Sequence, residues 1–342
     1  MILAIVLFVL LLASLAGNVT HFIENTFMMK LSREQAVGPK LDEVVLEDND
    51  SHNKVAVIRV EGIISSQFDD DGYDQVELIK EQLAHADEDK HVKAVVLKVD
   101  SPGGEVLASD DIAKAIAHFQ NDTKKPVVCS MGSLAASGGY YVSAPCRWIV
   151  ANELTITGSI GVIMHGWNYR GLMDKIGLRP DTYKSGKHKD MLSGERALDE
   201  IPPEEKAMVQ GLIDETYQKF KTVVAEGRAQ AHEENDKEGH ALSTDWANYA
   251  DGRVISGRQA LEIGLVDQLG DYDDAVNKAI ELAGISDKES ANVIEYQPRH
   301  DLADLLRLFG KSESRALKVD FGVKVPNLRP GCLYFLSPTF LR

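Results

Sequence analysis

Apolar, β-branched runs alternate with amphipathic segments through the first half of the chain. The apolar runs are residues 55–64, 92–100, 125–132 and 147–153. Their length and their polar boundaries are typical of buried strands. The apolar spacing of residues 74–86 predicts a helix, and a second helix is expected to open at the SPGG turn, residues 101–104. Strands that alternate with helices predict an α/β fold with a mainly parallel sheet, flanking helices and right-handed crossovers.

The second half has longer polar stretches. A helix is expected from about residue 203 to residue 228. Residues 229–246 are highly charged, so we expect a solvated surface insertion. Residues 250–270 indicate a turn, a short helix and a strand, and residues 271–285 indicate a helix. The last forty or so residues have little periodicity and are interpreted as a tail with apolar spots such as CLYFL, residues 332–336.

The N-terminus carries a different pattern. Residues 1–17 contain no charged side chain, and this length is near the lower limit for a membrane-spanning helix. We expect residues 1–23 to be an uncleaved transmembrane anchor and the polar residues 24–54 to be a linker. The alternative is a cleaved signal peptide, because small residues at 14 and 16 have the spacing of a cleavage site.

The sequence gives conflicting signals for the orientation of this anchor. Lys30, Arg33 and Lys40 follow the span, and the positive-inside rule taken alone would place the body in the cytoplasm. Met1 opens directly onto the apolar run, so a basic segment upstream of it would reverse that balance. We expect a single-pass protein with its catalytic domain on the extracytoplasmic side.

The amino-acid composition limits which binding partners are expected. The chain has 342 residues, 44% of them hydrophobic, which is a globular composition. A net charge of −16 disfavours a nucleic-acid partner, which requires a basic face. The three cysteines, Cys129, Cys146 and Cys332, form no zinc-binding pattern. We therefore expect neither a metal nor a cofactor.

The candidate chemistry lies where two predicted strands end. SPGG ends the second strand, and SLAASGG, residues 133–139, follows the third. Ligands of open α/β sheets collect at the carboxyl ends of strands. Glycines there expose amide groups that can form an oxyanion hole. Ser137, flanked by small residues, is the candidate nucleophile, and Ser133 is interpreted as a cap of the helix that carries Ser137.

A serine nucleophile needs a base. His165 and His188 are the nearest histidines, but neither lies in a distinctive setting. A lysine can replace histidine when burial favours its neutral amine. The candidates are Lys184, Lys187 and Lys189. The pattern alone does not choose among them, and three lysines in one loop are also typical of a solvated basic patch.

An ordered set of motifs resembles the signal peptide peptidase A family (peptidase family S49). The set is SPGG at 101–104, MGSLAASGGYYVSAP at 131–145, TGSIGV at 157–162, YKSGKHKDM at 183–191 and ADGRVISGRQALEIGLVDQLG at 250–270. The resemblance covers roughly residues 55–285. It implies a Clp protease/crotonase-like fold and a membrane-anchored serine endopeptidase with a Ser–Lys dyad.

The family pattern also implies site roles. Ser137 would be the nucleophile and Lys189 the general base. The amides of Gly104 and Gly138 would bind the oxyanion, and Ser159 would orient the lysine amine. The single catalytic unit resembles the short form of the family. That form implies a ring-shaped homo-oligomer in which a neighbour can complete each site.

The expected organisation and function follow. Residues 55–285 would form the peptidase domain and residues 286–342 a C-terminal extension. The substrates would be remnant signal peptides and other small apolar segments at the membrane. The alternatives are a catalytically inactive scaffold of the same fold and, less favoured because of the dyad motif, an acyl-CoA enzyme of the crotonase type.

Overall fold

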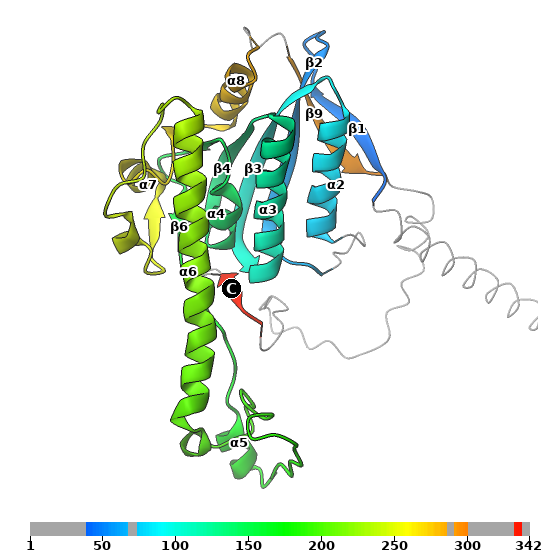
Figure 1. Cartoon of the computed structure of the whole chain (residues 1–342). Helices are drawn as coiled ribbons and strands as arrows, with labels where there is room; N and C mark the ends of the chain where they lie inside the picture. The colour runs from blue at the N-terminus through cyan, green and yellow to red at the C-terminus, as the bar shows by residue number, and fades with distance from the viewer. Residues whose placement is uncertain (1–38, 68–73, 286–290, 300–331, 337–342) are drawn as a thin grey trace, which may run out of the picture.

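The computed structural model describes residues 39–67, 74–285, 291–299 and 332–336, and these residues build a layered α/β body around one sheet (Figure 1). The strands of this described part are β1 (Leu41–Glu47), β2 (Asn53–Ile64), β3 (Val92–Glu105), β4 (Val127–Ala136), β5 (Trp148–Ala151), β6 (Ile156–Gly158), β7 (Val254–Ser256), β8 (Gln268–Leu269), β9 (Ala291–Pro298) and β10 (Tyr334–Leu336).

The sheet is mainly parallel. Its strand order is β1-β9-β2-β3-β4-β5-β8, with β10 added to β3 and β6 to β4. All pairs from β9 to β8 along this order are parallel, whereas β1, β7 and β10 pair antiparallel with their neighbours. Parallel strands covered on both faces are near-continuously apolar, which explains the β-branched runs in the sequence.

Helices cover both faces of the sheet. The helices are α2 (Gln75–Glu88), α3 (Val106–Thr123), α4 (Gly138–Ser143), α5 (Arg170–Lys175), α6 (Pro203–Glu234), α7 (Gly257–Glu262) and α8 (Tyr272–Leu282). Alternate residues of β2 divide between two cores: Ile58 packs in the larger core with α2, α3 and α4, and Val57 packs in the smaller core beneath α8. This alternation is the period of two expected of a strand.

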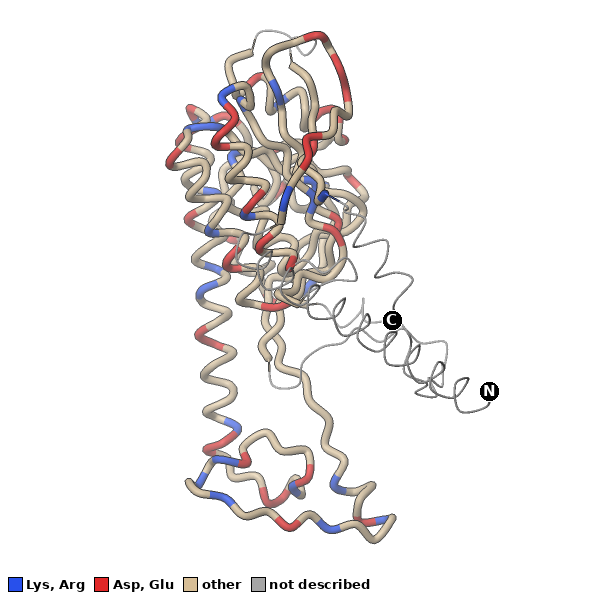
Figure 2. Tube along the Cα trace, turned by 90° about the vertical axis from the view of Figure 1, so that its right-hand side faces the viewer, with Lys and Arg blue, Asp and Glu red and all other residues tan. Residues whose placement is uncertain are grey.

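An arm projects from this body. We define the arm as residues 166–212, which comprise α5, its loops and the first turns of α6. Figure 1 shows α5 beside the N-terminal end of α6, away from the sheet. Both acidic and basic residues lie along the arm (Figure 2). The arm also exposes large apolar side chains, listed here: Trp167, Tyr169, Leu172, Ile176, Leu178, Tyr183, Leu192, Leu198, Met208 and Leu212.

The expected strands and helices of the body are present, but three local expectations are corrected. SPGG is not a turn, because β3 runs through it to Glu105 and pairs there with β2 and β10. Ser133 does not cap α4, because it lies exposed within β4 and Ser137 itself is the N-cap residue. The charged stretch after residue 228 is not a solvated insertion throughout: α6 continues to Glu234, and Ala231 is buried.

The sheet also extends past the boundaries drawn from the sequence. β1 lies within residues 24–54, the expected linker, and β9 and β10 lie beyond residue 285. Within the described ranges, no helix has the length and apolar character needed to cross a membrane. The expected anchor, residues 1–23, lies outside the described residues.

Candidate active site

Two backbone segments meet at the carboxyl ends of β3 and β4. A Cβ placed on Gly138 would lie 3.0 Å from the Gly104 nitrogen and 3.0 Å from the Gly103 Cα. A Cβ on Gly104 would lie 1.9 Å from the Ile64 carbonyl oxygen. The Gly104 position admits no side chain, and a Cβ on Gly138 would also lie 2.7 Å from Ser109 Oγ, so that position admits a side chain only if its neighbours shift. The structure therefore brings together the two predicted oxyanion residues, Gly104 and Gly138.

Ser137 lies at this junction in an uncommon backbone conformation. Its φ is 57° and its ψ is −117°, a region that residues other than glycine rarely adopt. The conformation is held on both sides: the Ser137 amide donates to the Gly158 carbonyl at 2.8 Å, and the Tyr141 amide donates to the Ser137 carbonyl at 2.9 Å. Ser137 is buried, at 1% exposure. Strain maintained by surrounding structure points to a functional position.

Ser159 lies beside this segment through β6. The strand pairs Ala136 with Gly158, so the residues after each of them, Ser137 and Ser159, leave the sheet next to one another. Ser159 is also buried and also has a positive φ, 52°. Its amide donates to the Arg253 carbonyl at 2.7 Å. The predicted orienting serine is thus on the same side of the fold as the predicted nucleophile.

The C-terminal strand β10 crosses the same junction. Phe335 pairs with Gly104, and Leu336 pairs with Gly103, in antiparallel register. A Cβ on Gly103 would lie 2.0 Å from the Phe335 carbonyl oxygen and 2.5 Å from the Gly138 nitrogen. An extended segment of the chain therefore lies directly against the glycine backbone of the site. The sequence reasoning missed this strand, although the apolar run at 332–336 was its signal.

An aromatic cluster holds β10 in place. The Phe335 ring lies 4.8 Å from that of Tyr141 and 4.6 Å from that of Phe220, measured between ring centroids. The Tyr141 hydroxyl donates to Asp110 at 2.7 Å. Burial alone would raise the pKa of Asp110, but hydrogen bonds from Lys114 and Tyr141 outweigh it and keep that pKa below its ordinary value.

A buried ion pair fixes the other end of α4. Arg228 of α6 donates to the Cys146 carbonyl at 2.9 Å and pairs with Asp267 at 2.5 Å, and both side chains are at most 5% exposed. Burial alone would lower the pKa of Arg228, but the Asp267 carboxylate outweighs it and raises that pKa. The helix that begins at Ser137 is therefore anchored at both of its ends.

The predicted base lies elsewhere in the chain. Lys189 is exposed and belongs to the arm, where its neighbour His188 contacts Glu205 at the start of α6. The Ser137 region packs against α6 near Phe220 instead. Fifteen residues of helix separate these two contact points, about 22 Å at 1.5 Å per residue. One chain therefore brings together Ser137, Gly138, Gly104 and Ser159 but not Lys189.

The other candidate bases and ligands are also accounted for. Lys184 and Lys187 form ion pairs within the arm, with Asp190 and Glu204 respectively. His165 packs edge-on against Trp167. In the described part of the chain, no group of three His, Cys, Asp or Glu side chains could hold a metal ion, and all three cysteines are free.

Comparison with known proteins identifies the family to which the chain belongs. The family model for peptidase family S49 matches residues 119–286, and the Clp protease model matches residues 52–150. A protein of Enterococcus faecium, named as a signal peptide peptidase SppA, is 36% identical over 84% of this chain and 80% of its own length. The chain belongs to peptidase family S49. This S49 peptidase is accordingly a serine peptidase with a mixed α/β fold, and the acyl-CoA alternative gains no support.

Two further proteases and one solved structure are also similar to this chain. A protease of Synechocystis is 42% identical to this S49 peptidase over 61% of the chain and 70% of the relative. Protease 4 of Salmonella typhi is 39% identical over 68% of the chain but only 35% of its own length. A solved membrane-bound stomatin-specific protease overlays with a TM-score of 0.43 at 17% identity, covering 75% of this chain and 97% of that one.

Proposed function

We propose that this protein is a Ser–Lys endopeptidase in which Ser137 is the nucleophile and Lys189 is the general base. The observation that carries the proposal is the junction of Gly104, Gly138 and Ser137. There, two backbone segments leave no room for side chains around a buried serine with a positive φ. Such packing suits a carbonyl that must approach the serine oxygen closely.

The proposed reaction runs in two half-cycles, and in each of them Lys189 first accepts a proton and then returns it. Neutral Lys189 accepts the proton of the Ser137 hydroxyl while Ser137 Oγ bonds to the substrate carbonyl carbon. The amides of Gly104 and Gly138 donate to the oxyanion that forms. The Lys189 ammonium then protonates the leaving amine as the peptide C–N bond breaks. Water, deprotonated by Lys189, releases the acyl group by the reverse roles.

The proposed substrate is an extended peptide with small or apolar residues. β10 is itself an extended segment paired antiparallel with β3 at Gly103 and Gly104. Addition of a strand to an open sheet edge is a general mode of peptide binding, with backbone hydrogen bonds supplying affinity. Remnant signal peptides have this apolar character, and signal peptide cleavage is what the name of the Enterococcus faecium relative states.

The proposed dyad forms between subunits. Within one chain, Lys189 is exposed on the arm and Ser137 is buried in the body. A second copy of the chain that seated its arm on this body would supply the lysine. It would also cover the exposed apolar side chains of the arm, which a monomer leaves in water. A ring-shaped homo-oligomer meets both needs.

We also propose the location drawn from the sequence. Residues 1–23 would anchor the protein in the membrane, with the catalytic domain on the extracytoplasmic side. That placement would concentrate the enzyme where apolar peptide remnants arise. A protease-accessibility assay on vesicles of known orientation tests it: digestion of the body from the cytoplasmic face would reverse the assignment.

The first experiment compares wild type with Ser137→Ala and Lys189→Ala in a peptidase assay on a signal-peptide-like substrate. Both variants should be inactive while remaining folded and assembled. Full activity of Ser137→Ala would refute the nucleophile. A correctly assembled wild type with no activity on any peptide would favour the inactive scaffold.

Co-expression of the two inactive variants tests the shared site. If each site takes its serine from one subunit and its lysine from the next, random mixing restores about a quarter of the wild-type sites. If both residues came from the same chain, no mixed site would be active. Expression of each variant alone provides the baseline.

A further inference from the structure

The segment that carries Lys189 is held by a network of charged side chains at the far end of α6. Asp190, the residue after Lys189, accepts from Lys184 at 2.5 Å and lies 3.5 Å from Arg196. His188, the residue before it, lies 3.2 Å from Glu205. Both neighbours of Lys189 in the chain are therefore tied to other parts of the arm.

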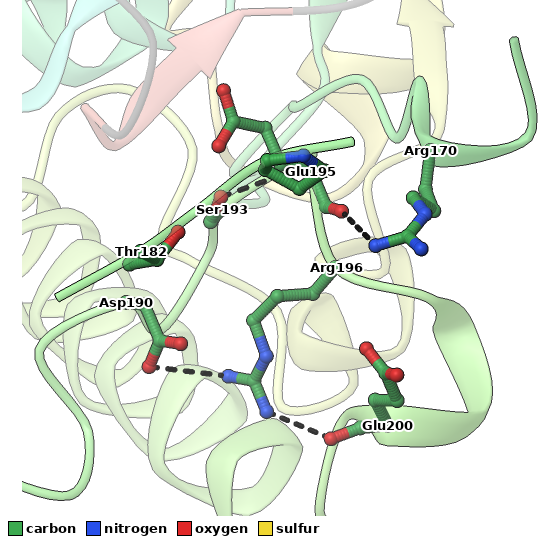
Figure 3. A pocket seen from close by; sticks show the side chains of 8 residues that line it. Arg170, Thr182, Asp190, Ser193, Glu195, Arg196 and Glu200 are labelled. Carbon is green, nitrogen blue, oxygen red and sulfur yellow. Dashed lines mark hydrogen bonds and ion pairs between the residues drawn. The ribbon is translucent and has the colours of Figure 1, made fainter. Parts of the chain in front are cut away.

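Arg196 and Glu205 form the centre of that network. Arg196 Nη1 donates to Glu205 Oε2 at 2.7 Å, and Arg196 Nη2 donates to the Glu200 carbonyl at 2.7 Å. Figure 3 shows the Arg196 guanidinium between Asp190 and Glu200, at the edge of a cavity of about 200 Å³. One planar cation thus joins the Lys189 loop, the 3₁₀ turn Leu198–Glu200 and the first turn of α6.

Glu205 is unusual among the charged groups of the arm because it is buried. Its side chain is 3% exposed, whereas the adjacent Glu204, which pairs with Lys187, is 47% exposed. A buried carboxylate is tolerated only when it is paired and hydrogen-bonded, and here the Arg196 guanidinium pairs with Glu205 while His188 Nδ1 lies 3.2 Å from it. The pair is therefore fixed in geometry, in contrast with surface ion pairs, which gain little and move freely.

We propose that Arg196 and Glu205 are positioning residues for Lys189: they set the path of residues 188–190 so that the lysine side chain is presented outward in one orientation. This inference rests on the proposed function, since it assigns a role relative to Lys189 as base. Lys189 makes no side-chain ion pair within the described residues, whereas Lys184 and Lys187, which precede it in the same loop, each make one. The network leaves this one lysine of the loop available.

The test compares two neighbouring substitutions of the same kind, Glu205→Gln and Glu204→Gln, in the full-length assembled protein. Glu205→Gln keeps the shape of the side chain but removes the charge that Arg196 and His188 contact. It should lower kcat about tenfold or more, with KM within about threefold, since misplacement of about 1 Å can cost up to about a hundredfold. Glu204→Gln should change neither value by more than about twofold.

A double-mutant cycle separates positioning of Lys189 from a general structural effect. The readout is the rate at which a fluorophosphonate probe labels Ser137, which remains measurable over long incubations. Glu205→Gln should slow labelling in the wild-type background but not in the Lys189→Ala background. Equal slowing in both backgrounds would overturn the inference, as would equal behaviour of the Glu204 and Glu205 variants.

Assembly is measured on every variant by sedimentation. If Glu205→Gln does not assemble, Arg196→Lys replaces it, because lysine keeps the charge but cannot bridge two acceptors in the same plane. Failure of both variants to assemble would also overturn the inference, since the network would then hold the subunit contact. Activity of Lys189→Ala itself would instead refute the proposed function, so the two failures are distinguishable.

Discussion

The two halves of the proposed dyad lie in regions built by opposite means. The Ser137 region is buried and fixed by backbone: glycine packing, strand pairing and amide hydrogen bonds leave it no freedom. The Lys189 region is exposed and fixed by charged side chains around Arg196 and Glu205. A nucleophile and an oxyanion hole need fixed geometry, whereas a base brought by another subunit needs a rigid but accessible support. Substitutions in each region can test this contrast.

The largest difference between the two regions is expected in kcat when a glycine is replaced by alanine. Gly138→Ala places a methyl group 3.0 Å from the Gly104 nitrogen, so it should reduce peptidase kcat by about a hundredfold or more, the scale of losing one oxyanion donor. Gly211→Ala, in the arm half of α6, has open space for its methyl group. It should leave kcat unchanged and stabilise the helix by about 1 kcal/mol. Steady-state kinetics and thermal unfolding check both.

Loss of an ion pair should likewise destabilise the body more than the arm. Arg228→Met leaves Asp267 charged and buried without its partner, and the free energy of unfolding should fall by about 3–5 kcal/mol. Arg170→Met removes a partly exposed i,i+4 pair with Asp174 on the arm, together with a 3.4 Å hydrogen bond to the Glu195 carbonyl, and should cost only about 1 kcal/mol. Denaturant titration measures both. Similar losses for the two variants would mean that the arm is as tightly packed as the body.

The C-terminal strand offers a test of access to the body. Phe335→Ala removes the ring that packs on Tyr141 and Phe220, so β10 should dissociate from β3 more readily. If β10 occupies the substrate position, activity on short peptides should rise several-fold while the melting temperature falls. Cys332→Ser, at the more exposed start of the segment, is the control. Unchanged activity would show that β10 does not compete with substrate.

Acid should loosen the arm. A hydrogen bond from Lys184 lowers the pKa of Asp190, and one from Lys187 lowers that of Glu204. A carboxyl whose pKa is lowered on folding contributes stability above its unfolded value, and this is lost as the pH falls through the folded value. After correction for the intrinsic slowing of amide exchange in acid, the hydrogen-exchange protection of the arm should therefore fall as the pH drops below about 4, near the ordinary values of Asp and Glu. Asp190→Asn with Glu204→Gln should remove that step.

Much of the body was predictable because its signals are local. The runs that became β2, β3, β4 and β5 are apolar over the length of a strand, and the glycines that meet at Ser137 lie at strand ends. β1, β9 and β10 were missed for the opposite reason: each is short or partly exposed, and its partner lies far away in the chain. The same holds for residues after 228, where charged side chains on one side of α6 hid the buried Ala231.

Only part of the candidate site could be predicted from the sequence. Close packing at Gly104, Gly138 and Ser137 follows from residue size, which the sequence displays directly. The separation of Lys189 from Ser137 does not, because it depends on how far α6 carries the arm from the sheet. The roles of Ser137, Lys189 and Ser159 remain predictions that the variants above address.

The long helix α6 acts on Lys189 as a lever. About 22 Å of helix lies between the Phe220 contact and Glu205, so a tilt of about 5° would carry the loop through about 2 Å. Errors of about 1 Å can reduce an enzymatic rate up to about a hundredfold. A helix that is held only near Phe220 therefore cannot position the Lys189 amine accurately enough for catalysis, even if the far end of the helix is rigid. The neighbouring subunit would have to serve as a second fulcrum, and the specific activity per chain would then fall on dilution, as the rings come apart.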